Sequence, residues 1–457
     1  MKKLWDGRFK RGLDPFIEEF SSSMSIDVKL AKYDIKGSIA HVKMLGKANI
    51  ITKNDAKKIL HGLEEILQEA SNGELKYTSA DEDIHMAIER ILVEKTGKVG
   101  NQLHTARSRN DQIALDERLY LRDELKEVSE LIKKLQAIII NTAQKNINVV
   151  IPGLTHMQHA QPVLFSHYLM AYFNMLDRDR GRLKDCLKRV NIMPLGAGAI
   201  AGTSFPIDRE YVAKLLGFSA ITENSIDTVS DRDFILEFVS CSAILMMHLS
   251  RLCEDIVIYS SEEFGYIELD DSICTGSSMM PQKKNPDVAE LIRGKTSRVY
   301  GSLMTLLSLM KSLPLSYNRD MQEDKPALFD AVGTVKTCLK AGAKLLKNIK
   351  LNKKRLEHVL TRDFSCATEI ADYLVRHGMA FRDAHKIVGR IVKHCIDNKK
   401  YLSDLTHLEF KTFSNLFFKD ILSFTSFNSS VKSKSSLGGT CLKSVEAQIE
   451  KAKSLLK

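Results

Sequence analysis

The chain has 457 residues, a formal net charge of +10 and eight cysteines that form no C-x-x-C pair. Scattered cysteines of this kind exclude a disulfide framework and a zinc knuckle, and they indicate reduced thiols in a cytoplasmic protein. The lysines are dispersed without interleaved aromatic residues, so the charge favours a solvated surface with some attraction for an acidic substrate, and no nucleic-acid interface.

Neither a targeting segment nor a membrane span is expected. The first residues include lysines but no apolar run of the signal-peptide type. The most apolar segment, 234–260, is interrupted by polar and charged residues, and this pattern predicts a buried helix. The interrupting residues are Glu237, His248, Arg251, Glu254 and Asp255.

The composition favours long helices. Proline occurs only nine times, and leucine, isoleucine, lysine and glutamate are abundant. Apolar spacing predicts helices over 35–48, 55–69 and 84–95, and then one continuous helix from about 111 to 146. At a rise of 1.5 Å per residue that helix is roughly 50 Å long, more than an ordinary domain needs. We predict an all-α chain of three helical domains, namely 1–110, a central bundle of long helices at 111–360, and 361–457.

The octet before the long helix, His104 to Asp111, contains a candidate anion site. Ser108 and Asp111 have the spacing of a capping box, with Asp in place of the usual Glu. Arg109 and Asn110, with a further arginine two positions earlier, place guanidinium and amide groups at a helix N-terminus, where anions bind. A charged, solvated helix end is the alternative interpretation of this octet alone.

Pro152-Gly153 breaks the chain, and a polar loop is expected to follow, with Pro162 starting the next long helix. His156 and His159 are the loop residues that titrate near neutral pH. A lone histidine is more often structural than catalytic, so the loop by itself gives neither of them a role.

A glycine-rich stretch at 194–203 predicts a tight connection in which backbone segments approach closely. No strand is expected before it, and the G-x-G-x-x-G pattern of dinucleotide binding is absent. We therefore do not assign a nucleotide to this stretch.

Residues 275–287 contain two serines, two lysines and two prolines around a glycine, which excludes regular structure in the first half. Asn285 suits an N-cap and Pro286 the first helical position, with Asp287 and Glu290 in the first turn. Loop amides and a lysine can together hold a carboxylate or the oxyanion of a delocalised carbanion. An ordinary surface loop with a lysine pair is the alternative.

A second polar segment, 315–326, precedes another predicted helix and includes Tyr317, Gln322 and Lys325. A charged surface turn is the simplest interpretation of that segment alone. From about residue 361 the predicted helices become shorter.

Three of these segments resemble signatures of one enzyme superfamily. Gly276 to Asn285 matches G-S-S-x-M-P-x-K-x-N of the aspartase/fumarase superfamily without a gap. The octet 104–111 resembles the first signature of argininosuccinate lyases, and 155–162 resembles their T-H-x-Q-x-A-Q-P signature.

The likeness to argininosuccinate lyases extends over nearly the whole chain, with two departures. The arm 3–9 is similar to their opening but has Asp6 where they usually have Gly. His159 stands where they usually have Arg. His85, on the predicted helix 84–95, has no assigned role, and that of His159 is also open.

The resemblance implies an all-α homotetramer in which each active site is built where three chains meet. Overlong helices agree with this, because four bundled chains can bury surfaces that one chain cannot. It also implies the reversible elimination of L-argininosuccinate to L-arginine and fumarate, through an aci-carboxylate intermediate, in the last step of arginine biosynthesis. No metal or other cofactor is expected, and no ligand set is visible.

The resemblance also implies roles for individual residues. Ser277 is the base that removes the carbon proton, His156 paired with Glu290 donates a proton to the leaving nitrogen, and Lys283 stabilises the intermediate. Reasoning from pKa values alone prefers His156 as the base and Ser277 as the donor, so this assignment stays open. The implied substrate-binding residues are Ser23, Asp27, Arg109, Asn110, Thr155, Gln161, Asn285, Tyr317, Gln322 and Lys325.

Two other functions stay open. A sister fumarate-releasing lyase, such as adenylosuccinate lyase, fumarase or aspartase, should share the 276–285 loop but lack the second half of the octet and the polar spacing at 315–326. A catalytically silent structural homologue should have lost Ser277, His156 or Lys283, and all three are present.

Overall fold

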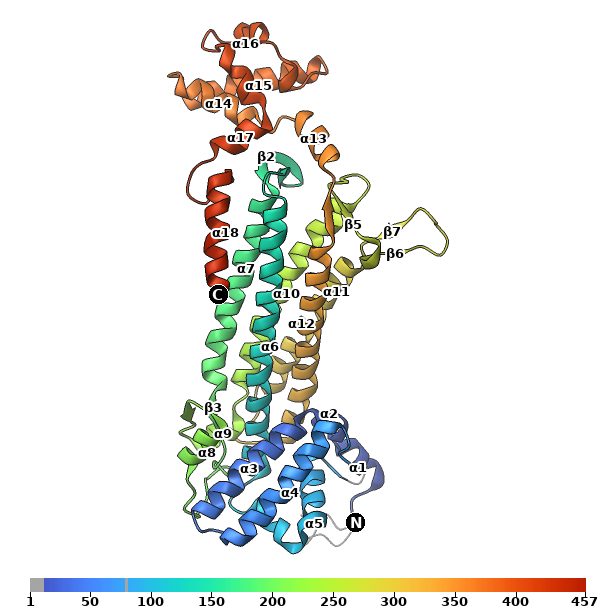
Figure 1. Ribbon diagram of the computed structural model, residues 1–457, viewed down its shortest axis with the longest axis vertical. Helices are drawn as coiled ribbons and strands as arrows, with labels where there is room; N and C mark the ends of the chain where they lie inside the picture. The colour runs from blue at the N-terminus through green and yellow to red at the C-terminus, as the bar shows by residue number, and fades with distance from the viewer. Residues whose placement is uncertain (1–11, 79–80) are drawn as a thin grey trace. The chain divides into compact units, whose positions relative to one another are not determined.

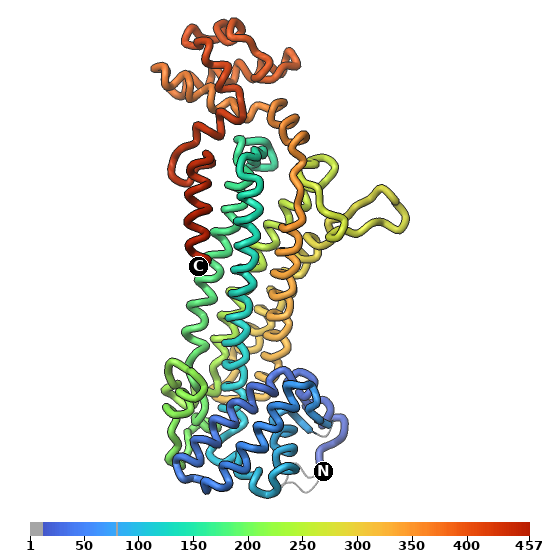
Figure 2. Tube along the Cα trace, in the orientation of Figure 1, coloured from blue at the N-terminus to red at the C-terminus, as the bar shows by residue number. Residues whose placement is uncertain are grey.

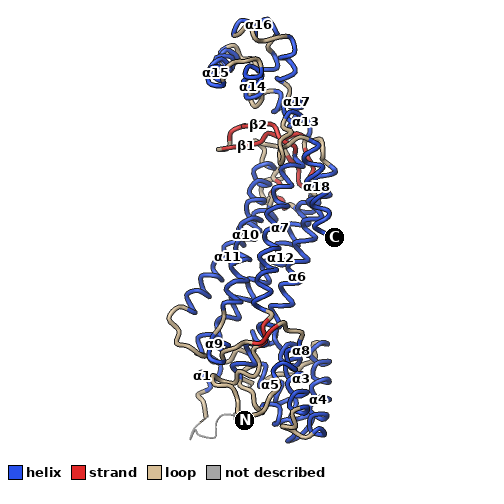
Figure 3. The backbone as a smooth tube through the Cα atoms, turned by 90° about the vertical axis from the view of Figure 1, so that its left-hand side faces the viewer, coloured by secondary structure: helices blue, strands red, loops and turns tan. Residues whose placement is uncertain are grey.

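The computed structural model describes residues 12–78 and 81–457. Helices make up most of this part of the chain, and its strands are short and paired in twos (Figure 3). The prediction of an all-α fold is therefore confirmed. The arm at 3–9 lies outside the described residues.

The chain divides into two compact units made of discontinuous segments. The first comprises 1–129, 181–243 and 297–335, and the second comprises 130–180, 244–296 and 336–457. Five long helices contribute residues to both units, namely α6 (Arg109–Lys145), α7 (Phe165–Val190), α10 (Asp233–Ser260), α11 (Asp287–Met310) and α12 (Asp324–Lys347). The division into three domains, with boundaries near 110 and 360, stays a prediction.

The described part of the first unit starts with a run of helices, some of which begin at a side chain that caps the first turn. They are α1 (Pro15–Ser21), α2 (Met24–Asp27), η2 (Val28–Leu30), α3 (Ala31–Lys47), α4 (Lys53–Asn72), α5 (Ile84–Thr96) and η3 (Gly97–His104). The hydroxyl of Thr52 accepts the N–H of Asp55 at the start of α4, and the carboxylate of Asp83 accepts the N–H of Met86 at the start of α5. The helices predicted over 35–48, 55–69 and 84–95 are thus confirmed within a few residues, as α3, α4 and α5 (Figure 1).

The helix predicted from about 111 to 146 is α6, a single uninterrupted element of 37 residues. At 1.5 Å per residue it is about 55 Å long. Its trace is continuous in Figure 2. Of its apolar side chains, Val128, Ile132, Leu135 and Ile139 have no solvent exposure, so the predicted spacing is that of a buried face.

Helix α10 contains the most apolar segment of the sequence. Among the described residues it is the one helix long and apolar enough to span a membrane by length and composition. Of its most apolar stretch, 56% is buried inside the protein. Burial of this extent is typical of a core helix.

The glycine-rich stretch at 194–203 directly follows the two-residue strand β3 (Ile192–Met193), so the expectation that no strand precedes it is wrong. After it come α8 (Arg209–Leu216), β4 (Ala220–Ile221) and α9 (Ser225–Ser230). The carboxylate of Asp111 accepts the N–H groups of Gly196 and Gly198, both at 2.9 Å. Gly198 has φ of 64°, and a Cβ there would lie 2.5 Å from the carbonyl oxygen of Gly202. The predicted close backbone approach is confirmed, and it joins this stretch to the first turn of α6.

The segment after Pro152 differs from its prediction. It is a hairpin of β1 (Val150–Thr155) and β2 (Gln158–Leu164), in which Pro162 pairs with Pro152. The expectation that Pro162 starts a helix is therefore wrong, and α7 begins at Phe165. Both strands of a two-stranded sheet are edge strands, so a proline without an N–H can be accommodated there.

The signature segment 275–287 is a second hairpin in the second unit, so the expectation that its first half contains no regular structure is wrong at Thr275 and Gly276. β6 (Thr275–Gly276) pairs with β7 (Lys284–Asn285), and the loop between them protrudes from its neighbours (Figure 1). Helix α11 begins at Asp287, one residue later than predicted, because the N–H of Glu290 donates to the carbonyl of Pro286. Pro286 is thus the capping residue rather than the first helical residue.

The remaining elements are short, as predicted for the C-terminal part. They are β5 (Ile267–Leu269), η4 (Asp271–Ile273), η5 (Arg319–Glu323), β8 (Ile349–Leu351), α13 (Lys353–Thr361), α14 (Ala367–Arg376), α15 (Phe381–Asp397), η6 (Leu402–Asp404), α16 (His407–Phe413), η7 (Lys419–Thr425), α17 (Phe427–Ser433) and α18 (Leu442–Leu456). Strands β5 and β8 pair antiparallel. Residues from 366 to 421 share a separate apolar cluster that includes Tyr373, Ile391, Phe410 and Phe417.

We predict that Gly198→Ala lowers the free energy of unfolding by about 2–4 kcal/mol, because an alanine must adopt a left-handed conformation against a carbonyl oxygen. Gly181→Ala is the matched control: this glycine lies within α7, with no atom within 4 Å of its added Cβ. The control should gain up to about 1 kcal/mol. Thermal unfolding of both variants measures the difference, and equal melting temperatures would contradict the prediction.

Candidate active site

A cleft of about 830 Å³ lies within the first unit. It is lined from α2, α5, η3, the first turns of α6, and the segment that leads into α12. Seven of the ten predicted substrate-binding residues line it, although they are spread over three hundred positions of sequence. These residues are Ser23, Asp27, Arg109, Asn110, Tyr317, Gln322 and Lys325.

Lys325 is held in the cleft by a buried ion pair. Its Nζ lies 3.3 Å from Asp27 Oδ1, and the exposed fractions of the two side chains are 3% and 1%. Burial by itself would lower the pKa of Lys325, but Asp27 and Asp324 outweigh it and hold that pKa above its ordinary value. The hydroxyl of Ser23 donates to Asp27. Lys325 therefore presents a full positive charge at a fixed position.

A second buried ion pair fixes the helix turn that carries Lys325. Arg232 Nε lies 2.5 Å from Asp324 Oδ2 and 3.1 Å from Glu117 Oε2, and all three side chains are almost fully buried. Burial raises the pKa of Glu117 to about 8. Because Asp324 precedes Lys325 in the chain, Arg232 connects α6 and α10 to the wall of the cleft.

Arg109 is paired with an acid of the same cleft. Its Nε lies 3.2 Å from Asp83 Oδ2, and its Nη1 donates to Gln112 at 2.9 Å. Burial by itself would raise the pKa of Asp83, but the charge of Arg109 outweighs it and lowers that pKa. Asn110 Nδ2 donates to the carbonyl of Ala199 in the glycine-rich stretch. The octet is thus ordered by contacts rather than solvated.

Sequence reasoning missed four charged residues of the cleft, Glu82, Asp83, Glu89 and Arg319. Glu89 lies three residues after Met86 on α5, which is the spacing of one helix face, and this was the available signal for Glu89. Burial raises the pKa of Glu89. Arg319 donates to the Glu82 carboxylate at 2.8 Å, across a sequence separation of 237 residues that no local pattern could reveal.

Ser277 lies in the loop between β6 and β7, in the second unit. Its Oγ accepts the N–H groups of Met279 at 3.2 Å and Met280 at 3.0 Å. Lys283 Nζ donates to Asn285 Oδ1 at 2.5 Å. Three predicted residues, Ser277, Lys283 and Asn285, therefore share one exposed loop, which ends at the first turn of α11 with Glu290. Two N–H donors aimed at a serine oxygen favour its deprotonated form.

His156 is at the tip of the β1–β2 hairpin, between Thr155 and Gln158. His156 and Met157 both have positive φ, 54° and 59°. Two-residue turns of this kind usually contain Asn or Gly, and a larger residue in a left-handed conformation costs about 1–2 kcal/mol. Thr155 and Gln161 lie exposed on the same hairpin. Strained residues of this kind cluster at functional sites.

His85 packs against two buried carboxylates. Its Nδ1 lies 3.1 Å from Asp34 Oδ1 and 3.4 Å from Asp116 Oδ2, with all three side chains buried. Burial by itself would raise the pKa of Asp34, but His85 and Arg107 outweigh it and lower that pKa. Burial and the charge of Asp34 raise the pKa of Asp116. The cluster connects α3, α5 and α6, and two of these helices also line the cleft.

The fold is that of a lyase. The family model described as Lyase matches residues 7–301. An EDDS lyase variant with bound fumarate superposes with a TM-score of 0.84 at 26% identity, over 98% of this chain and 91% of that one. The class II fumarase of Schistosoma mansoni has the same fold, with a TM-score of 0.75 at 18% identity, over 90% of this chain and 91% of that one.

A second family model and two similar relatives show which family of lyases the chain belongs to. The model described as Argininosuccinate lyase C-terminal matches residues 364–432. The argininosuccinate lyase of Geobacter metallireducens is 54% identical over 99% of both chains. That of Bacillus cereus is 53% identical over all of this chain and 99% of its own. The chain belongs to the argininosuccinate lyase family.

His41 supports the octet and makes it sensitive to acid. The ring lies 2.8 Å from the carbonyl oxygen of Thr105, and burial with the nearby Arg107 lowers the pKa of His41 to about 3. The unfolded chain binds a proton at this residue below about pH 6.5, whereas the folded chain does so only near pH 3. Stability from the neutral ring is therefore complete above pH 6.5 and is lost progressively down to about pH 3.

We predict that His41→Gln, which keeps a donor for Thr105, removes up to about 2 kcal/mol of the stability lost between pH 7 and pH 5. Melting temperatures at the two pH values measure the effect. His61→Gln is the control, since His61 lies on α4 with 78% of its side chain exposed. A pH response of the His41 variant equal to that of wild type would refute the assignment.

Proposed function

We propose that this protein is an argininosuccinate lyase, which reversibly cleaves L-argininosuccinate to L-arginine and fumarate. The observation that carries the proposal is the cleft of mixed charge in the first unit, which brings together seven residues expected to bind this substrate. The reaction is the last step of arginine biosynthesis, and we place the enzyme in the cytoplasm. The chemistry requires proton transfer and charge stabilisation only.

The charges of the cleft suit the charges of the substrate. Argininosuccinate has three carboxylates, one α-ammonium group and one guanidinium group. Arg109, Arg319 and Lys325 supply positive charge, and the acids of α2 and α5 supply negative charge. We assign Tyr317, Gln322 and Lys325 to the arginine-side carboxylate and amine. A sister lyase acting on malate or aspartate has no use for so many paired charges.

Ser277 is our candidate for the base. It takes the proton from the succinyl carbon next to a carboxylate, and the electron pair of that C–H bond moves into the carboxylate to form a doubly charged aci-carboxylate. The two loop amides that hydrogen bond to Ser277 Oγ stabilise an alkoxide, which makes a weak base usable.

The intermediate collapses to fumarate. Its electron pair forms the new C=C bond as the C–N bond breaks, and the guanidino nitrogen takes up a proton. We assign that proton to His156, with Glu290 as its partner. Lys283, Asn285, Thr155 and Gln161 are proposed to hold the charged carboxylates, because fixed donors around a developing dianion give the largest stabilisation. The opposite assignment, with His156 as base and Ser277 as donor, predicts a different pattern of deuterium exchange in the variants of these two residues.

We also propose that the enzyme is a homotetramer in which chains share active sites. Helix α11 has an exposed apolar stripe at helical spacing, formed by Tyr300, Met304 and Leu307, with exposed fractions of 43%, 60% and 47%. Exposed apolar stripes on long helices are usually covered by other subunits. The substrate cleft is in the first unit, whereas Ser277 and His156 belong to the second.

Purified protein tests the function directly. Argininosuccinate should be converted to fumarate, followed by ultraviolet absorbance, with arginine formed in equal amount. Adenylosuccinate, malate and aspartate are the comparison substrates for the sister lyases. Turnover of one of these in place of argininosuccinate would reject the proposal, and turnover of none would favour the silent homologue.

We predict that Ser277→Ala and His156→Asn leave folding intact and lower turnover by a factor on the order of a thousand. The two variants separate the roles when argininosuccinate is incubated in heavy water. If Ser277 is the base, His156→Asn still exchanges the succinyl proton for deuterium without cleavage, whereas Ser277→Ala does neither. The reverse pattern would assign the base to His156, and turnover like that of wild type would remove the residue from the mechanism.

We predict that two inactive variants restore activity when they share a tetramer. Ser277→Ala and Arg109→Ala carry one defect in each unit of the chain. If a site takes its cleft from one chain and its loop from another, co-expressed hybrids contain intact sites and reach about a quarter of wild-type activity. Size-exclusion chromatography with light scattering establishes the tetramer, and hybrids no more active than their parents would contradict shared sites.

A further inference from the structure

His159 joins the β1–β2 hairpin to two other segments of the second unit. Its Nδ1 lies 2.9 Å from Asp363 Oδ2, and its Nε2 lies 3.1 Å from the hydroxyl of Tyr266. Both ring nitrogens are therefore occupied by partners far away in sequence. The ring has no atom left for a substrate, so a direct part in the chemistry does not fit.

The partners of His159 are themselves fixed. Tyr266 is 3% exposed, its N–H donates to the carbonyl of Tyr259, and its own carbonyl accepts the N–H of Asn352. Asp363 follows α13 and accepts the N–H and hydroxyl of Ser365. His159 therefore contacts a fixed residue at each of its two ring nitrogens.

His159 also lies where the hairpin changes register. Gly153 pairs with Gln161, but Leu154 pairs with His159, so Ala160 is an extra residue in β2. A bulge of this kind re-aims the side chains beyond it. Beyond it are Thr155 and the strained turn with His156, whose side chains are exposed.

We propose that His159 is the positioning residue for His156, fixing the turn so that the His156 imidazole is presented in one orientation. The inference rests on the proposed function. The turn residues are in a left-handed conformation that short loops leave easily, and an exposed turn has no packed core to hold it. The two hydrogen bonds of His159 hold the hairpin three residues from His156.

The role has a kinetic signature that simple structural support lacks. Removing the anchor misplaces the turn with His156 and the adjoining Thr155 but leaves the seven predicted binding residues of the first unit in place. His159→Ala should therefore lower kcat by about 10- to 100-fold, with little change in KM for argininosuccinate. In heavy water its ratio of carbon–deuterium exchange to cleavage should match that of His156→Asn, because both variants impair the same group.

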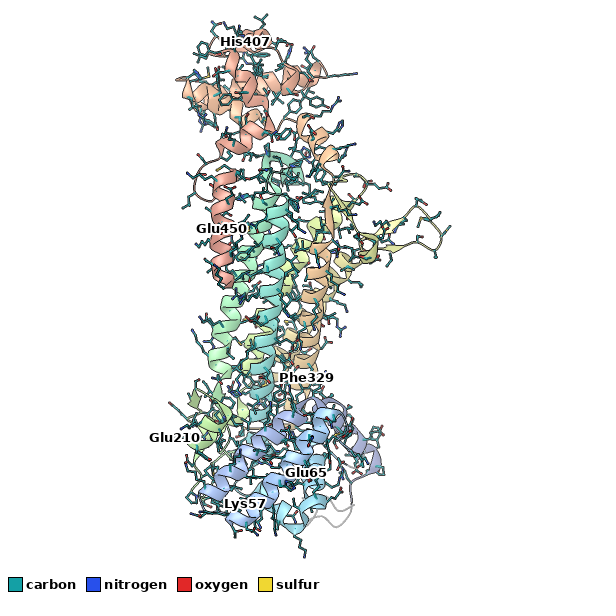
Figure 4. All side chains as sticks on the ribbon, viewed as in Figure 1. Lys57, Glu65, Glu210, Phe329, His407 and Glu450 are labelled. Carbon is teal, nitrogen blue, oxygen red and sulfur yellow. The ribbon has the colours of Figure 1, made fainter. Side chains whose placement is uncertain are left out.

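Three further variants sharpen the test. His159→Arg can donate to both Asp363 and Tyr266 and should recover most of the kcat. Tyr266→Phe removes one hydrogen bond, so its kcat should lie between those of wild type and His159→Ala. His407→Ala is the matched control. His407, labelled in Figure 4, is a half-buried histidine of the same unit whose Nε2 contacts the carbonyl of Phe417, and its loss should lower the melting temperature without changing kcat.

The outcomes separate the two proposals. If wild type does not turn over argininosuccinate, the proposed function fails. If wild type is active and His159→Ala has wild-type kcat per folded tetramer, or an exchange ratio unlike that of His156→Asn, the positioning role is overturned. A loss of kcat in His407→Ala as large as that in His159→Ala would also overturn it, because any lost histidine contact would then suffice.

Discussion

The buried pair of Lys325 and Asp27 is the interaction on which the proposed substrate cleft depends. A single unpaired charge at such depth costs several kcal/mol, and breaking a buried pair by removing one partner costs about 3–5 kcal/mol. Two helix ends that contribute one charge each are thereby held together, because separating them leaves both charges unpaired. Ser23 donates to Asp27 as well, so α2 and α12 have one favourable arrangement.

The buried ion pairs of Arg232 add a second constraint of the same kind. Its guanidinium lies between Glu117 and Asp324, and the three groups come from three different elements. Since Asp324 is next to Lys325, movement of the lysine would disturb a second buried pair. Charges fixed in this way do not reorganise when a charged substrate arrives, so the cleft can hold the arginine side of the substrate in one position. The same buried ion pairs thus stabilise the fold and preorganise the cleft.

Local chemistry determined how much of the fold could be predicted. The starts of α4 and α5 follow from Thr52 and Asp83, each a short polar side chain that caps a helix, and an apolar face defined α6. Pro162 was assigned wrongly because a proline suits a first helical turn and an edge strand equally well. Only the pairing of Pro162 with Pro152, an interaction between strands, decides between the two.

The cleft shows a second limit of prediction from sequence. Its residues were identified by motif, but Arg319 and Glu82, or His159 and Tyr266, are paired by tertiary folding alone. No spacing encodes such a pair. The left-handed turn at His156 is similar, because no glycine or asparagine indicates it. The strain there is visible only in the backbone, and the contacts of His159 are what the structure offers to offset it.

The residues proposed to bind the substrate and those proposed to transfer protons need opposite surroundings. Groups that bind charge gain from burial, since a low dielectric strengthens each ion pair, and the cleft residues other than Asn101 and Arg319 are buried or half-buried. Groups that transfer protons must meet a substrate that enters from water, and the two residues that we propose for this role, Ser277 and His156, lie on loops with exposed neighbours. An exposed base cannot by itself exclude water from a dianion, so the loop needs a surface to close against. In our proposal another subunit provides that surface. This explains why one chain can have a complete binding cleft but an incomplete catalytic site.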